Sequence, residues 1–275
     1  MRCINAISLT AAVHSWLKDP DHLRVLNVFD HACNLINENQ EVLSVVTAEI
    51  GNGPFNLVLA EDVLFPRYLD IGSSVSFHDD NLTLGDLTVN AGQAKLWAPR
   101  PAWEGLHAKR EDILNQIISL PVIHYQSSLP TQLLAVFSAS LAAADLPASL
   151  TGAKQLAGLG MGLTPAGDDF ILGAVLAAWI IHPFGVANVL AREITNIAAP
   201  LTTSLSAAWL RSAGRGEAGG LWHYFFEALL SPDAAQLQNA MDTVLEVGET
   251  SGADALSGFS GVFIHFGESI DTKFH

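Results

Sequence analysis

A run of alternating glycines followed by two acidic residues is the part of this chain best suited to chemistry. Residues Gly158 to Asp169 read GLGMGLTPAGDD, and the uncharged stretch from Phe170 to Ile181 follows at once. Alternating glycines leave the backbone bare and permit positive φ angles. Thr164 and Pro165 are residue types that begin a helix, since the threonine hydroxyl can cap it and the missing N–H of proline costs nothing there. The pattern predicts a bare loop that leads into a buried helix.

Such a helix start can bind a small polar or anionic ligand. The N–H groups of the bare loop, including those of Gly160 and Gly162, suit phosphate or carboxylate oxygens. Asp168 and Asp169 fall in the first turns, where the helix dipole favours negative charge, and they can instead orient a cation or a polar substrate. A purely structural role fits the same residues. The run lacks the Gly-Lys-Ser/Thr ending of a P-loop and the later glycine of a dinucleotide-binding fingerprint.

A second segment repeats the spacing of the first. Gly162-x-Thr164-x-x-x-Asp168 is matched by Gly248-x-Thr250-x-x-x-Asp254, and each precedes an apolar stretch that contains glycine. Ser251 lies three residues before Asp254, which is the spacing of a capping box with Asp in the acidic role. We expect the two helix starts to converge on one pocket; chance similarity between helix starts is the alternative. The catalytic candidates are the aspartates at these two starts: Asp168, Asp169 and Asp254.

Two further segments supply polar groups. Residues 200–206 read PLTTSLS, a polar helix start whose hydroxyls suit carboxylate, amide or phosphate oxygens, although plain capping of a helix through Trp209 explains them as well. Residues 212–220 read SAGRGEAGG, a loop whose single cation, Arg215, can close over an anion or stay solvated. The substrate-binding candidates are these residues: Gly160, Gly162, Thr164, Thr202, Thr203, Ser204, Arg215, Thr250 and Ser251.

Composition excludes several classes of protein. The chain has 275 residues, 49% of them hydrophobic, so it can bury a large core. With 28 acidic and 13 basic residues its net charge is −15, which argues against nucleic acid and anionic membranes as partners. Cys3 and Cys33 form no CxxC pair, and the histidines form no metal-binding pattern, so we predict neither a metal nor a cofactor. We see no signal peptide and no membrane-length apolar run, and predict a cytoplasmic protein.

The spacing of apolar residues predicts an α+β fold. The first hundred residues are β-rich, and short strands at this spacing suggest a small barrel or sandwich. From Trp103 onward the periodicity is helical. We therefore predict a β-rich N-terminal barrel or sandwich-like region, 1–100, and an all-α helical region, 101–275, that carries the glycine motif. The expected N-terminal elements are a helix at Ala6–Leu17 and strands at Leu23–Phe29, Glu41–Ile50, Phe55–Ala60, Gly72–Phe77 and Leu82–Val89. The expected helices that follow are Trp103–Leu120, Leu133–Ala144, Asp168–Ile181, Val186–Ile197, one through Trp209, Leu221–Leu230, Ala234–Glu246 and Ala255–Phe263.

Taken together, the motifs resemble those of one family. The segments GLGMGLTPAGDDFILG (158–173), LTTSLS (201–206) and GETSGADALSG (248–258) resemble, in the same order, the recurrent motifs of a bacterial family formerly of unknown function. That family is associated with the AllH-type subunit of oxamate carbamoyltransferase. The resemblance runs from about Leu23 onward and is specific in the C-terminal half. One departure is Glu249, which stands where many relatives carry histidine.

The resemblance implies a subunit of a multi-subunit carbamoyltransferase of anaerobic allantoin use. That enzyme converts oxalurate and phosphate into oxamate and carbamoyl phosphate, so the implied partners are a small anionic substrate and other protein subunits. Carbamoyl transfer passes through a tetrahedral oxyanion, which preorganised N–H donors stabilise. The motifs can supply such donors, and their aspartates can orient an amide NH₂ or a lysine. The motifs carry few cations for phosphate, so a partner subunit is expected to supply them.

Two other functions remain open at this point. One is a non-catalytic assembly or regulatory subunit, in which the glycine motif packs or senses a ligand. The other is a stand-alone enzyme that acts on a small carboxylate, with Asp168 and Asp169 holding a divalent metal, since hard cations favour clustered carboxylates. Adjacent helical residues point about 100° apart, which disfavours that metal pair.

Overall fold

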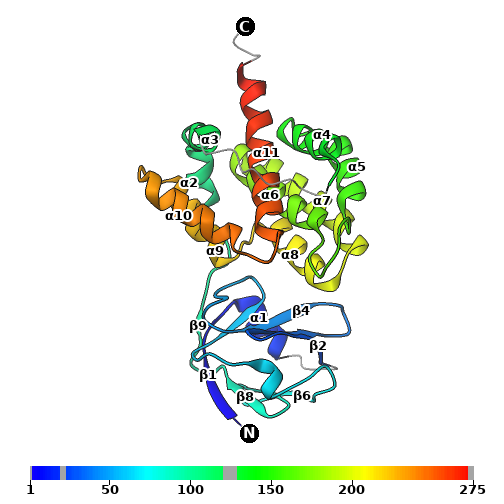
Figure 1. The fold of residues 1–275 in the computed structure, drawn as a ribbon, viewed down its shortest axis with the longest axis vertical. Coiled ribbons are helices and arrows are strands. Elements are labelled where there is room, and N and C mark those ends of the chain that lie inside the picture. Colours follow the sequence, from blue (N-terminus) through cyan, green and yellow to red (C-terminus); the bar gives the residue numbers. More distant parts are fainter. Residues whose placement is uncertain (1, 19–22, 120–128, 272–275) are drawn as a thin grey trace. The chain divides into compact units, whose positions relative to one another are not determined.

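The computed structural model describes residues 2–18, 23–119 and 129–271, and it divides into two compact units (Figure 1). The first unit comprises residues 1–99 and the second residues 100–275. The first is a nearly closed, barrel-like sheet and the second is helical, and helices make up 53% of the described residues. The predicted α+β class, with a β-rich N-terminal part and a helical C-terminal part, is confirmed.

Strand β1 (Arg2–Leu9) is the centre of the sheet. It pairs antiparallel with β5 (Asn56–Leu59) and parallel with β8 (Leu87–Asn90), and the short β9 (Lys95–Leu96) pairs with its end. The strand order is β2-β3-β4-β5-β1-β8-β7-β6. The remaining elements of this unit are α1 (Ala11–Leu17), β2 (Arg24–Val28), β3 (Ala32–Ile36), β4 (Val42–Val46), the 3₁₀ turn η1 (Phe65–Arg67), β6 (Val75–His78) and β7 (Asn81–Leu84).

Three features of this unit differ from the sequence prediction. The helix predicted at Ala6–Leu17 is wrong in its first half, because β1 runs to Leu9 and the hydroxyl of Thr10 caps a helix that begins at Ala11. The single strand predicted at Leu82–Val89 is the hairpin of β7 and β8, which turns at Gly85 with a φ of +53°. Strands β1, β3 and β9 were not predicted.

Eleven helical segments make up the described part of the second unit. The helix predicted at Trp103–Leu120 is two helices that divide at Lys109, and Leu120 lies outside the described residues. Helix α5 was not predicted, although Asp145 caps it by accepting from the Ala148 N–H at 3.1 Å. The segments are α2 (Trp103–Ala108), α3 (Arg110–Ser119), α4 (Thr131–Ala142), α5 (Leu146–Leu156), α6 (Ala166–Ile181), α7 (Phe184–Ala198), η2 (Ala199–Leu201), α8 (Ser204–Gly214), α9 (Gly220–Leu229), α10 (Ala234–Leu245) and α11 (Ser251–Asp271).

Helix α6 is the core of the helical unit. Every residue of α6 except Leu172 is buried, as its uncharged sequence predicts. Helices α7, α8 and α11 all pack against it. In the described part of the chain, no helix combines the length and the hydrophobicity that crossing a membrane requires.

Helices α6 and α11 cross with their backbones in contact, and this crossing brings their N-terminal ends together. A Cβ atom at Gly173 would overlap the carbonyl oxygen of Ala255, and one at Gly258 would overlap that of Phe170. Each helix therefore contributes a glycine where the other approaches. Only glycine lets the two backbones come this close.

We expect Gly173→Ala to lower the free energy of unfolding by about 1–3 kcal/mol, because an added methyl group forces apart two buried backbones. Gly185→Ala, near the start of α7, is the matched control, since a Cβ there meets nothing within 4 Å. That change should be neutral or slightly stabilising. Urea titrations followed by far-UV circular dichroism compare the two variants, and equal midpoints would contradict the close crossing.

Candidate functional site

The starts of α6, α8 and α11 lie together, and the three segments singled out in the sequence meet there. The hydroxyls of Thr164 and Ser251 are hydrogen-bonded at 2.9 Å, which joins the starts of α6 and α11. The Thr203 hydroxyl donates to the Leu163 carbonyl oxygen at 2.6 Å, which joins the start of α8 to the glycine loop. The predicted convergence of the two repeated helix starts is therefore confirmed; that they enclose a pocket stays a prediction.

The glycine loop has the backbone that its sequence predicts. Gly158, Gly160 and Gly162 have φ angles of +71°, +117° and +98°. A Cβ at Gly158 would lie 2.5 Å from the carbonyl oxygen of Leu201, and one at Gly160 would lie 2.8 Å from the N atom of Ala166. These two glycines are thus required both by their φ angles and by close neighbours.

Asp168 is buried and connects the glycine loop to α8. Its Oδ1 accepts from the Gly158 N–H at 2.9 Å, and its Oδ2 accepts from the hydroxyls of Thr202 and, at 3.0 Å, Ser206. Burial raises the pKa of Asp168, and these three donors oppose that rise. Both oxygens are occupied by the protein itself, so the geometry favours a positioning role for this residue.

Asp169 differs from Asp168 because one of its carboxyl oxygens accepts no hydrogen bond. The residue is 8% exposed, and its Oδ2 has no hydrogen-bond partner among the described residues. Burial raises the pKa of Asp169 to about 8; the nearby Ser251 and Thr164 hydroxyls lower it, and the charges of Asp254 and Asp168 raise it. At neutral pH this carboxyl group therefore keeps its proton. Asp254, fully buried at the start of α11, is close enough to act on it.

The hydroxyl residues take roles that the sequence did not fully predict. The predicted cap at Thr164 is wrong, because Pro165 occupies the cap position of α6 and no side chain caps that helix. Thr250 rather than Ser251 precedes α11, since its carbonyl oxygen accepts from the Asp254 N–H at 2.9 Å. The capping box predicted for Ser251 and Asp254 is therefore wrong, because Ser251 is the first residue of α11.

The start of α8 combines capping with a contact that sequence reasoning missed. Thr203 is the cap, with its hydroxyl accepting from the Ser206 N–H at 3.1 Å, and Ser204 is the first residue of the helix. Ser206 was not a candidate, yet its hydroxyl binds Asp168. Its position four residues after Thr202 could have indicated this, because residues at that spacing near a helix start face the same side.

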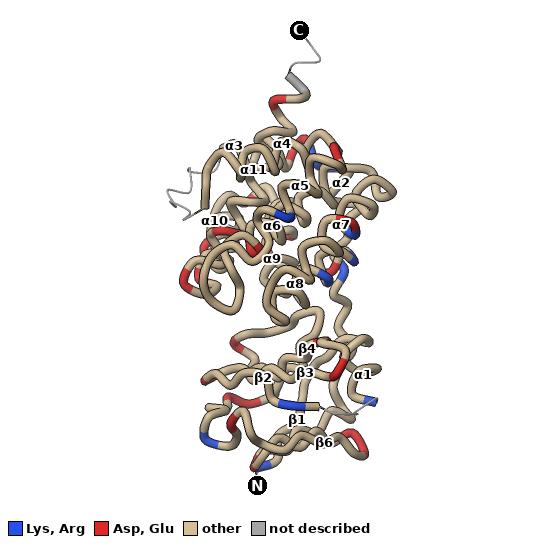
Figure 2. Tube along the Cα trace, turned by 90° about the vertical axis from the view of Figure 1, so that its right-hand side faces the viewer, with Lys and Arg blue, Asp and Glu red and all other residues tan. Residues whose placement is uncertain are grey.

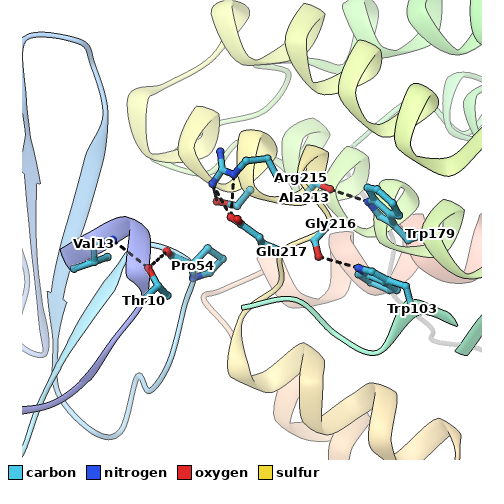
Figure 3. A network of polar contacts seen from close by, with 10 residues as sticks. Thr10, Val13, Pro54, Trp103, Trp179, Ala213, Arg215, Gly216 and Glu217 are labelled. Carbon is cyan, nitrogen blue, oxygen red and sulfur yellow. Dashed lines mark hydrogen bonds and ion pairs between the residues drawn. The ribbon is translucent and has the colours of Figure 1, made fainter. Parts of the chain in front are cut away.

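Arg215 lies at the other end of α8. With about 1.5 Å per helical residue, it is roughly 18 Å from the Thr203 cap. Its guanidinium group binds Glu217, at 2.6 and 3.1 Å, and the Ser212 hydroxyl (Figure 3). The adjoining turn is fixed by indole N–H bonds from Trp103 to Gly216 and from Trp179 to Ala213. The structure therefore does not bring Arg215 to the aspartate cluster.

The arrangement bears on metal binding as well. The carboxylates of Asp168 and Asp169 face different partners, so they do not form the adjacent pair that a metal-dependent enzyme would need. Within the described residues, no three His, Cys, Asp or Glu side chains converge as ligands. The cluster instead offers hydroxyl groups and the neutral carboxyl group of Asp169 with its unoccupied Oδ2, which suit a small molecule with both amide and carbonyl groups.

The fold and the cluster define the class: a two-unit α+β protein with a buried group of carboxyl and hydroxyl side chains where helix starts meet. Known family models account for both units. The AllH family N-terminal domain matches residues 5–96, and the oxamate carbamoyltransferase subunit AllH matches residues 156–263. The chain belongs to the AllH family, and a role as a carbamoyltransferase subunit implies other protein subunits. No solved structure matches it significantly.

Proposed function

We propose that this chain carries a substrate site of oxamate carbamoyltransferase, at the junction of the α6, α8 and α11 starts. The enzyme transfers the carbamoyl group of oxalurate to phosphate, giving carbamoyl phosphate and oxamate. The observation that carries the proposal is the unoccupied Oδ2 of Asp169, buried beside two hydroxyls and a second carboxyl group. A buried polar atom without a partner is costly, so a ligand that supplies one is favoured there.

The chemistry of the transfer matches the groups present. A phosphate oxygen attacks the carbamoyl carbon, the bond from that carbon to the oxamate nitrogen breaks, and this nitrogen must gain a proton as it leaves. Asp169 is protonated at neutral pH and is suited to donate that proton, which it regains from the phosphate. Asp254 would accept from the carbamoyl NH₂. The hydroxyls of Thr164 and Ser251, once their mutual hydrogen bond opens, would donate to the oxyanion.

Access to this site requires movement. Asp169 is shielded from solvent, so a substrate reaches it only when the glycine loop or the turn before α11 is displaced. The proposal includes a cytoplasmic complex that serves the anaerobic use of allantoin, as the sequence resemblance implies. Partner subunits would supply the cations that phosphate needs.

A thermal-shift experiment tests the proposal, with the isolated chain and with the assembled enzyme. Oxamate or oxalurate should raise the melting temperature, and a ligand at a hundred times its Kd adds about 2.7 kcal/mol of stability. Asp169→Asn should abolish this shift. Asp242→Asn, an exposed position on α10, is the matched control and should keep it.

The outcomes separate the three functions. Loss of the shift and of carbamoyl transfer in the Asp169→Asn enzyme supports a substrate site. Full activity of that assembled variant would leave this chain an assembly or regulatory subunit. Activity that a chelator abolishes would instead favour the metal-dependent alternative. The absence of any shift in both preparations would overturn the proposal.

A further inference from the structure

An exposed apolar surface borders the aspartate cluster. Met161, at the tip of the glycine loop, is 94% exposed, and its neighbour Leu163 is 40% exposed. Leu201, the last residue of η2, is 51% exposed, and the Thr203–Leu163 bond and the close approach of Gly158 to the Leu201 carbonyl oxygen place that segment against the loop. We define the glycine-loop surface by its large exposed apolar residues: Leu159, Met161, Leu163, Leu201 and Val247.

The three segments that form this surface are joined to one another. A bond from Thr203 to Leu163 connects α8 to the loop, and one between Thr164 and Ser251 connects the loop to the turn that carries Val247. Single exposed apolar residues are ordinary, but several of them on segments that are bonded to one another favour an interaction site. The surface therefore requires an explanation beyond local folding.

The loop holds Met161 outward in a defined conformation. Glycines with positive φ stand on both sides of it, at Gly160 and Gly162. The loop is also anchored by the Asp168 bond to the Gly158 N–H. A flexible thioether side chain adapts to a facing surface, and methionine is enriched at protein interfaces.

The three segments that form this surface carry no positive charge, and the exposed Lys154, four residues before Gly158, belongs to the last turn of α5. Segments 158–165, 201–206 and 246–254 contain no lysine or arginine, whereas the third contains the exposed Glu246 and Glu249. One acidic residue, Asp242, lies on α10, and Asp233 and Glu246 flank that helix, where Figure 2 shows red segments. Arg215 is held at the far end of α8 by Glu217. A site for phosphate needs a cation, and these segments have none to offer.

We propose that the glycine-loop surface is the docking surface for a basic subunit of the carbamoyltransferase, which covers Met161 and sets an arginine or lysine beside Glu249. The inference rests on the proposed function, because it assigns to the partner the cation that phosphate requires. The apolar centre and the acidic edge fit a partner patch that is apolar within and basic at its rim.

Co-expression with the remaining subunits of the oxamate carbamoyltransferase tests this inference. Met161→Glu should weaken assembly at least tenfold, because it places a carboxylate in the desolvated centre of the interface. Val136→Glu is the matched control, since Val136 is a half-exposed apolar residue on α4 outside the surface. Glu249→Lys should also weaken assembly, and the wild-type complex should weaken as salt rises.

Other results would overturn the inference. Unchanged assembly of Met161→Glu would exclude this surface as the interface. A changed oligomeric state of the isolated variant would assign the surface to a second copy, and a lowered melting temperature would assign it to another part of this chain. Failure of the proposed function gives a different signature: Met161→Glu alone should keep the oxamate-induced shift, and Asp169→Asn alone should keep assembly.

Discussion

Replacing Asp168 with alanine is expected to lower the free energy of unfolding of the helical unit by about 3–5 kcal/mol. The change leaves three donors without their acceptor inside the protein: the Gly158 N–H and the hydroxyls of Thr202 and Ser206. It also removes one of the links between the glycine loop and α8, leaving the Thr203 bond to Leu163. Urea titration followed by the circular dichroism of the helices measures the loss.

Removing a single donor to the Asp168 carboxylate should lower the free energy of unfolding by less than removing the carboxylate itself. Thr202→Val and Ser206→Ala each remove one donor and should each cost about 1–2 kcal/mol. Because the three side chains share one network, their effects should not add. Asp242→Ala, at an exposed position on α10, should stay within about 0.5 kcal/mol of wild type.

The alanine variant also separates a positioning role from a catalytic one. If Asp168→Ala folds as stably as wild type, the carboxylate does not hold the loop, and a direct part in chemistry becomes the better interpretation. If it unfolds as expected, loss of activity in that variant says nothing about catalysis. Asp169 is then the residue on which the chemistry must be tested.

The sequence was informative where a pattern has one structural solution. The uncharged run after Asp169 can only be a buried helix, and the glycine spacing predicted positive φ angles that Gly158, Gly160 and Gly162 all have. The repeated Gly-x-Thr-x-x-x-Asp spacing placed two helix starts together, and the Thr164–Ser251 bond shows that they meet. Local signals sufficed because loop and helix start are adjacent in the chain.

Prediction failed where two signals competed. In β1, buried Ile4 and Ala6 alternate with more exposed residues, but the apolar residues that continue through Leu17 concealed this period of two. The turn at Gly85 is only two residues long, so β7 and β8 looked like one strand. The unpartnered Oδ2 of Asp169 was not predictable from the sequence. Which oxygen lacks a partner depends on the donors that α8 and α11 bring to each aspartate.

Replacing Asp169 with asparagine is expected to change how stability depends on pH. The folded-state pKa of about 8 lies above the ordinary value of 3.8, so the folded protein binds one more proton than the unfolded chain between those values. Stability therefore falls as pH rises through this window, by up to about 1.4 kcal/mol per pH unit. Asparagine resembles the neutral acid and does not titrate. The variant should match wild type near about pH 4 and exceed it by several kcal/mol near about pH 9.

Melting curves of both proteins across that pH range measure the difference, with Asp242→Asn expected to follow wild type throughout. A difference that does not change with pH would mean that Asp169 is ionised in the folded protein. Carbamoyl transfer would then need another donor for the oxamate nitrogen, because an ionised carboxylate has no proton to give. A difference that grows with pH would show that folding itself keeps the proton on Asp169. Burial of Asp169 would then cost the fold stability above neutral pH, and the same burial would keep the carboxyl group protonated as a general acid. Only an unusually high pKa leaves a carboxyl group protonated at neutral pH.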